Sequence, residues 1–259
     1  MKIIHLLHSQ PFFAVHRLLT KLFLGKLDYL VVQSHESQHL IQKHLPKKKV
    51  VYVRGPQLDL IPRTNETISK ELAQKKLQIK GDVLLFFGFV RPYKGLKILL
   101  NAMPAILAQR PKLTLLVVGE YWGDQAEYEN IIDALHIREH VKLVNRFVKD
   151  EEMPLYFSAA DAVILPYTAI SQSAVIPTAL SFGVPILASN VGGNAEWVND
   201  GKNGLLFSAG SENEITEKVI QFYQQKLEKK MRLFITKNID QWKWSKKLEQ
   251  LILQQKNEI

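Results

Sequence analysis

The 259-residue sequence has no cysteine, which excludes disulfides, thiolate zinc sites and cysteine nucleophiles. Glycine and proline are scarce, at 13 and 11 residues, so collagen-like and linker-like chains are excluded as well. No apolar run approaches the ~20 residues of a membrane-spanning helix. The first residues do not fit a signal peptide, because His5 and His8 interrupt the apolar stretch. These absences favour a cytoplasmic protein, with contact at the inner face of the membrane left open.

The residues that are present describe an ordinary globular protein. Hydrophobic residues make up 46% and charged residues 23%, and the length lies between one module and two full domains. Lysine and arginine outnumber the acids by 34 to 25, which gives a net charge of +9. Such a surface attracts phosphorylated ligands or anionic lipid. Its basic clusters lack the interleaved aromatics of a nucleic-acid platform, so no nucleic-acid partner is predicted.

From residue 83 onward, continuous apolar runs alternate with segments of helical period. Uninterrupted apolar strands separated by helices predict a parallel sheet covered on both faces, which right-handed crossovers wind into a Rossmann-like α/β domain. Ligands of such sheets bind beyond the carboxyl ends of the strands. The expected strands are 83–89, 112–120, 141–148, 162–167, 185–189 and 204–208.

The helices expected between these strands carry two local signals. Pro104 lies inside the first helix and argues against one unbroken segment. Ser211 with Glu214 three residues later predicts a capping box at the start of the last one. The expected helices are 96–107, 124–135, 150–160, 174–182 and 211–227, with a short one after Gly193.

The first 80 residues show the same alternation with only three strands, KIIHLLH, YLVVQS and VVYVRG, and a short helix capped by Ser34. Three strands make a poor sheet, so this part resembles the second half of a doubly wound domain. The tail IDQWKWSKKLEQLILQQ is predicted to be one amphipathic helix. The resulting domain prediction is a partial N-terminal domain at 1–77, a complete domain at 78–232, and a final helix within 233–259 that packs back on the N-terminal part.

The segment FFGFVRPYKG (86–95) is the most informative chemically. A strand ends at Gly88, and a loop with Arg91 and Lys94 enters a helix at Gly95. A guanidinium, an ammonium and free helix amides together suit a diphosphate. The alternative is a solvated loop with two ordinary basic residues.

A second candidate follows the strand AVILPY. Gln172, Ser173 and Ala174 lie at the N-terminus of the next helix, where small residues let a phosphate approach the backbone amides. Ser173 could equally be a simple N-cap.

Several collinear motifs resemble family-4 retaining glycosyltransferases with the GT-B fold. They are FGFVRPYKGL, LTLLVVGE, VKLVNRFV, DEEMPLYFSAADAVILPY, SFGVPILASNVGGNAEWV and DGKNGLLF. The resemblance implies a GT-B-like architecture and transfer of a sugar from a nucleoside diphosphate to a glycan or lipid-linked acceptor, in polysaccharide or cell-envelope synthesis. It implies no metal cofactor.

The resemblance also assigns roles to residues at matching positions. Arg91 and Lys94 would stabilise the charge that develops on the leaving diphosphate. By alignment on HRLLTKLFL, His5 falls where the family has a histidine facing the donor sugar, and His8 is the alternative if a gap intervenes. The remaining donor-binding matches are Gly88, Glu120, Arg146, Phe147, Gln172, Ser173, Ala174 and Thr178.

Two departures from the family stand out. Ile170 and Thr178 replace two glutamates that the family commonly carries, although SQSAV resembles a branch that lacks this pair. The glycine-rich loop of the first acceptor-domain strand is absent. The chain would then be a nucleotide-binding fragment that needs a partner for transfer, or an enzyme in its own right.

Other functions fit less of the sequence. HESQH (35–39) matches a zinc motif in which His35 and His39 would bind the metal and Glu36 would act as base, but no third ligand follows at the required spacing. A nucleotide-sugar epimerase would demand more carboxylates in the cleft. The helix FFAVHRLLTKLFL fits a membrane surface or the core of the first domain.

Overall fold

The computed structural model describes residues 23–24, 26–27, 29–32, 34–52, 68–170 and 172–242. The described residues fall into two compact units, 23–52 and 68–242, and each is considered by itself. His5 and the segment after residue 242 lie outside the described residues, so their predicted roles stay predictions. Of the described helices, none combines the length and hydropathy of a membrane span.

The first unit contains one parallel strand pair and its crossover helix. β1 (Tyr29–Val32) pairs with β2 (Lys49–Tyr52), and α2 (His35–His44) connects them. The Ser34 hydroxyl accepts a hydrogen bond from the Ser37 amide at 3.1 Å, so the predicted N-cap is confirmed. Within the described residues this unit is a single βαβ element, and its assignment as part of a doubly wound domain stays a prediction.

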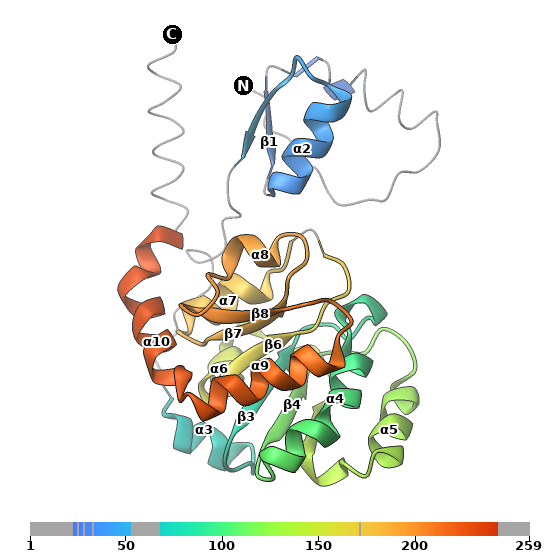
Figure 1. Cartoon of the computed structure of the whole chain (residues 1–259), viewed down its shortest axis with the longest axis vertical. Coiled ribbons are helices and arrows are strands. Elements are labelled where there is room, and N and C mark those ends of the chain that lie inside the picture. Colours follow the sequence, from blue (N-terminus) through green and yellow to red (C-terminus); the bar gives the residue numbers. More distant parts are fainter. Residues whose placement is uncertain are drawn as a thin grey trace. The chain divides into compact units, whose positions relative to one another are not determined.

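The second unit is a six-stranded parallel sheet with helices on both faces (Figure 1). Its strand order is β5-β4-β3-β6-β7-β8, so the direction of winding reverses between β3 and β6. The predicted complete doubly wound sheet is confirmed. The strands are β3 (Val83–Phe87), β4 (Thr114–Val118), β5 (Val141–Val144), β6 (Ala162–Leu165), β7 (Ile186–Ser189) and β8 (Gly204–Phe207).

Alternate residues of each central strand enter opposite cores, which is why these strands read as unbroken apolar runs. Leu85 and Phe87 of β3 face one core, while Leu84 and Phe86 face the other. The first core is covered by α3 (Lys70–Lys76), α6 (Met153–Ala159), α7 (Val175–Ser181) and α8 (Asn194–Trp197). The second is covered by α4 (Leu96–Gln109), α5 (Gln125–Ala134) and α9 (Glu212–Gln224).

Three details differ from the sequence-based expectation. α4 continues through Pro104, because its buried apolar face outweighs one lost hydrogen bond. The helix expected at 211–227 ends at Gln224, and α10 (Leu227–Asn238) begins after Lys226, which has a φ of +50°. The capping box is half formed, since Ser211 accepts from the Glu214 amide but the Glu214 carboxylate accepts from the Ser208 amide.

Short 3₁₀ turns complete the unit at η1 (Pro92–Lys94), η2 (Arg138–His140), η3 (Asp150–Glu152) and η4 (Ile239–Trp242). α3 was not expected from the sequence and packs on α6. The compact unit that holds the sheet therefore begins earlier than residue 78.

Candidate functional site

The carboxyl ends of β3 and β4 approach each other at two glycines. Gly88 has a φ of +97° and Gly119 a φ of +145°, which side chains other than hydrogen disfavour. A Cβ on Gly119 would lie 2.2 Å from the Gly88 carbonyl oxygen, and one on Gly88 would lie 2.9 Å from the Lys94 Nζ. Glycine is therefore required at residue 119 because the two backbones approach closely, and at residue 88 because the Lys94 ammonium lies against its Cα.

Lys94 is the most unusual charged group of the described residues. The residue is only 8% exposed, and it forms no ion pair with an acidic side chain of the described residues. Burial, and then the nearby charge of Arg91, lowers the pKa of Lys94 to about 8. Its Nζ lies 5.8 Å from the ring centre of Tyr167. A buried ammonium without an anion is unfavourable, so this position suits an anionic ligand.

Arg91 is the second cation of this loop. Its Cζ lies 3.7 Å from the ring centre of Trp122 and 5.9 Å from that of Phe89. Its Nε is buried and has no hydrogen-bond partner among the described residues. Because its charge lowers the pKa of Lys94, the two cations act on the same small region. We call Arg91 and Lys94 the cation pair.

The end of β6 holds this loop from the other side. The Thr168 amide donates to the Tyr93 carbonyl at 2.8 Å, and its hydroxyl donates to the same oxygen at 3.2 Å. A Cβ on Gly95 would lie 1.9 Å from the Pro166 carbonyl oxygen. The cation pair is thus fixed where the strand order reverses, which is where doubly wound sheets bind ligands.

The loop before α7 contributes the small residues predicted from the sequence. Ser173 is buried, Ala174 is exposed at the helix start, and Gln172 is half-buried. A Cβ on Gly88 would lie 3.5 Å from Val175, the first residue of α7, so this helix begins beside the β3 loop. The Thr178 hydroxyl donates to the Ala174 carbonyl at 2.8 Å and is engaged within α7.

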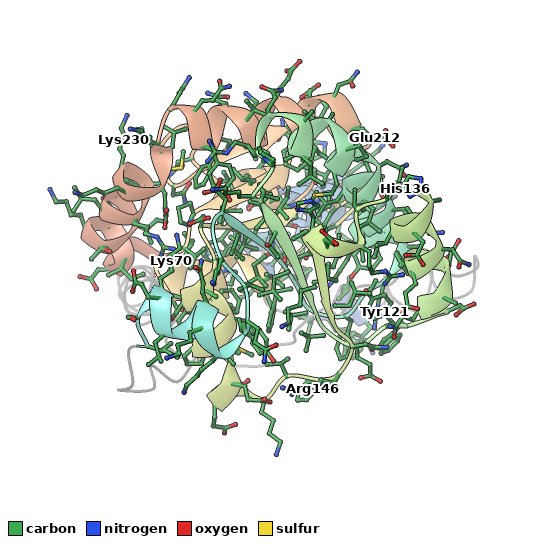
Figure 2. All side chains as sticks on the ribbon, turned by 90° about the horizontal axis from the view of Figure 1, so that it is seen from below. Lys70, Tyr121, His136, Arg146, Glu212 and Lys230 are labelled. Carbon is green, nitrogen blue, oxygen red and sulfur yellow. The ribbon has the colours of Figure 1, made fainter. Side chains whose placement is uncertain are left out.

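The predicted residues after β4 and β5 lie differently. The Glu120 side chain is exposed, and its carbonyl accepts from the Val90 amide at 2.9 Å. Arg146 donates to the Glu152 carboxylate at 2.8 Å and to the Tyr156 hydroxyl at 3.0 Å (Arg146 is labelled in Figure 2). Glu152 neutralises the charge of Arg146. In turn, the hydrogen bonds from Arg146 lower the pKa of the Glu152 carboxyl to about 2. The donor-binding role of Arg146 stays a prediction.

Phe147 leaves an exposed aromatic surface beside the site. It is 61% exposed, and its ring centre lies 6.4 Å from that of Phe89. The ring centre of Phe89 in turn lies 5.4 Å from that of Trp122. Sequence reasoning missed Trp122 and Tyr167, although a tryptophan directly after a strand of a doubly wound sheet is a recognisable signal.

The zinc alternative gains no support from α2. The His35 ring stacks on Tyr52 at 3.8 Å between ring centres, and its Nδ1 lies 3.3 Å from the Gln38 Oε1. The described residues contain no group of three histidine or acidic side chains placed to hold a metal ion. His39 is exposed.

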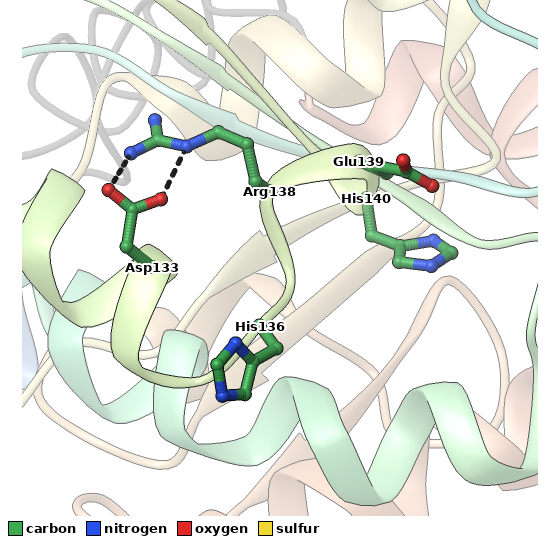
Figure 3. A pocket seen from close by; sticks show the side chains of 5 residues that line it. All are labelled: Asp133, His136, Arg138, Glu139 and His140. Atoms are coloured by element: carbon green, nitrogen blue, oxygen red, sulfur yellow. Dashed lines mark hydrogen bonds and ion pairs between the residues drawn. The ribbon is translucent and has the colours of Figure 1, made fainter.

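Two cavities of the sheet unit lie at the opposite, amino end of the strands. One, of about 260 Å³, is lined by residues of the turn before β5 and is drawn in Figure 3. There the Arg138 guanidinium turns to Asp133, with an Nη2–Oδ2 distance of 2.7 Å. The other, of about 240 Å³, lies beside Gly81 and Arg110. Neither contains a residue of the cation pair.

The sequence of this unit matches a known family. Residues 68–242, well over half of the chain, match the family described as glycosyl transferases group 1. The chain belongs to this family. The resemblance to family-4 retaining glycosyltransferases is thereby confirmed.

Curated relatives and solved structures agree with this membership. The chain is 31% identical over 169 residues to spore coat protein SA of Bacillus subtilis, covering 62% of this chain and 45% of that protein. It is 30% identical over 189 residues to D-inositol 3-phosphate glycosyltransferase of Frankia alni, covering 70% and 46%. The chain thus spans less than half of either relative.

Among solved structures, the fold is similar to that of HepE from Anabaena in complex with UDP. The TM-score is 0.78 at 24% identity, covering 95% of this chain and 69% of that one. The C-terminal domain of the LpcC glycosyl transferase from Francisella tularensis gives a TM-score of 0.62 at 18% identity, covering 73% of this chain and 99% of that one. The six-stranded sheet therefore has the fold of a GT-B C-terminal domain.

Proposed function

We propose that this chain supplies the donor side of a retaining glycosyltransferase that takes its sugar from a UDP-sugar. The observation that carries the proposal is the cation pair, a buried ammonium and a stacked guanidinium without an acidic partner among the described residues. Two positive charges at the switch point of a doubly wound sheet suit the two phosphates of a nucleoside diphosphate.

The chemistry that follows is electrostatic. In sugar transfer the bond between the anomeric carbon and the diphosphate oxygen breaks, and negative charge grows on the leaving diphosphate. Arg91 and Lys94 would stabilise that charge in a site of low dielectric. Their positions are fixed before the donor arrives, so little reorganisation is needed during the reaction. This role needs no metal ion.

The choice of UDP rests on relatives. HepE is described in complex with UDP and with UDP-glucose, and the pneumococcal transferase GtfA in complex with UDP and GlcNAc. By analogy we propose a glucose-type donor, a glycan or lipid-linked acceptor, and a role in polysaccharide or cell-envelope synthesis. Gln172, Ser173 and Ala174 would meet the sugar and phosphate, Phe147 the base, and His5 the reacting sugar.

Calorimetric titration with UDP, GDP and ADP tests the proposal. UDP is expected to bind the wild-type chain, and binding should disappear in the double variant Arg91→Ala, Lys94→Ala. The matched control is Lys229→Ala, Lys230→Ala, which removes the same charge from exposed positions of α10. Figure 2 shows Lys230 on the opposite side of the unit from Arg146. Equal weakening in both double variants would mean that only net charge matters and would contradict the site.

A transfer assay then separates an enzyme from a binding fragment. Release of UDP from UDP-glucose, with retained configuration in the product, is expected of the enzyme. Binding of UDP without sugar release, in the presence of a range of glycan and lipid-linked acceptors, would favour a chain that binds nucleotide and awaits a partner.

A further inference from the structure

Trp122 lies in a loop whose backbone is tied to the residue before Arg91. Its amide donates to the Val90 carbonyl at 3.0 Å, while the Val90 amide donates to the Glu120 carbonyl at 2.9 Å. The Tyr121 amide donates to the Asn145 Oδ1 at 3.1 Å, which anchors the same loop to the strand end of β5. The backbone of Trp122 is therefore held at a fixed position relative to the start of the Arg91 loop.

Trp122 is 55% exposed, whereas tryptophan is on average highly buried. One of its faces is covered by the Arg91 guanidinium, and Phe89 meets it edge-on at 5.4 Å between ring centres. Trp122 thus lies at the surface and contacts a functional side chain. A contribution to the core alone would not require this exposure.

Arg91 needs the support of Trp122 because, apart from the more distant ring of Phe89 at 5.9 Å, no group of the described residues holds its guanidinium. Its Nε has no hydrogen-bond partner, no acidic side chain pairs with it, and its like-charged neighbour Lys94 repels it. A free arginine side chain has large rotamer entropy, which would be lost on each binding event. The face of an indole attracts a guanidinium and excludes water from one side of it.

We propose that Trp122 is a positioning residue of the donor site, which holds the Arg91 guanidinium in place to receive the donor diphosphate. This inference rests on the proposed function and goes beyond it, since it assigns to Trp122 a role in donor binding that is exerted through its contact with Arg91. Trp122 would act through Arg91 alone.

A double-mutant cycle in UDP binding tests this assignment, because it isolates the coupling between two side chains. Trp122→Ala is expected to weaken UDP binding about three- to tenfold in the wild-type background, the range of a partly exposed cation–π contact. In the Arg91→Ala background the same substitution should change affinity by less than about twofold. Trp122→Phe retains an aromatic face and should restore most of the affinity. Leu233→Ala, at another 55% exposed apolar side chain, is the matched control.

Each other outcome contradicts a distinct claim. Equal weakening by Trp122→Ala in both backgrounds would mean that the indole acts on the nucleotide directly or on the loop as a whole, which overturns the positioning role. Unchanged affinity in Trp122→Ala, with UDP still bound by the wild type, overturns it as well and leaves the proposed function intact. A folded wild-type chain that binds no UDP overturns the proposed function and, with it, this inference.

Discussion

Two groups of charged residues, one at each end of the six-stranded sheet, differ in whether they are paired within the fold. At the amino end, the buried Asp161 accepts hydrogen bonds from the Val83 amide at 2.6 Å and the Tyr223 hydroxyl at 3.1 Å, and it pairs with Lys70. At the carboxyl end, Lys94 and Arg91 have no acidic partner among the described residues. Paired charges stabilise the fold, whereas under the proposed function the unpaired charges of Lys94 and Arg91 bind the donor diphosphate.

Arg232 extends this pattern at the amino end. It donates to the Ala160 carbonyl at 2.6 Å and the Gly183 carbonyl at 3.2 Å, and it pairs with Glu228 at 2.9 Å. The network thus ties α10 to the loops before β6 and β7. Both described cavities lie near this end, where charged groups such as Arg138 and Arg110 are already paired. In this unit the unpaired charges of Arg91 and Lys94 are therefore a better guide to a binding site than the two cavities.

The largest expected effect is at the amino end. Asp161→Ala should lower the free energy of unfolding by about 3–5 kcal/mol, because it leaves a buried amide, a hydroxyl and an ammonium without their acceptor. Chemical denaturation followed by circular dichroism measures this. Asp133→Ala removes an exposed carboxylate paired with Arg138 and should change the free energy of unfolding far less than Asp161→Ala does, because solvent screens an exposed ion pair. Similar losses of stability in the two variants would mean that the buried hydrogen bonds and ion pair of Asp161 add no more stability than an exposed ion pair.

Arg91→Ala should weaken UDP binding and leave the free energy of unfolding almost unchanged. Loss of a charge-assisted hydrogen bond to the diphosphate is expected to weaken UDP binding by about 1.5–3 kcal/mol. The free energy of unfolding should change little, because Arg91 has no partner within the fold beyond the surface of Trp122 and Phe89. Calorimetry and denaturation of the same preparation measure both quantities. Unchanged UDP affinity would remove Arg91 from the site.

The pH dependence of UDP binding sharpens the comparison further. Burial lowers the pKa of Lys94 to about 8, so the free site loses its ammonium charge as the pH rises above that value. UDP stays fully ionised over this range, and its affinity should therefore fall, by up to about tenfold per pH unit above 8. Lys94→Arg keeps its charge throughout and should flatten the profile between pH 7 and 9.5. A flat wild-type profile would contradict the lowered pKa.

The sequence predicted the sheet well because its signals are local. Unbroken apolar runs such as VLLFF mark strands buried on both faces, and the structure buries all five of these residues. The positions of Arg91 and Lys94 followed from the strand end at Gly88. The break at Lys226 was missed because a positive φ at a lysine leaves no compositional trace.

Side-chain partners were harder to predict than positions. Arg146 lies after β5 as expected, yet Glu152, six residues later, neutralises it across a turn. The contact of Trp122 with Arg91 joins residues from the ends of two strands, and its geometry depends on backbone hydrogen bonds between those loops. Such pairings are tertiary, and the sequence pattern of either segment alone does not contain them.

The smallest expected effect is a stabilisation: replacing Lys94 should raise the free energy of unfolding, whereas replacing Asp161 should lower it. The pKa of Lys94 in the fold, about 8, lies below the usual value of about 10.4, so its charged form is disfavoured by folding. This penalty is fully present below pH 8 and is relieved as the pH rises toward 10, where the folded chain loses the proton first. Lys94→Met should therefore raise the free energy of unfolding by about 1–2 kcal/mol at pH 7, and the gain should shrink at pH 9.5. Thermal and chemical denaturation at both pH values measure this gain.

The Lys94→Met variant should also lose UDP binding, whereas the control Lys230→Met should change neither the free energy of unfolding nor the affinity for UDP. A destabilised Lys94→Met variant would mean that the buried ammonium already has a stabilising partner, and the contrast between the two ends of the sheet would fail.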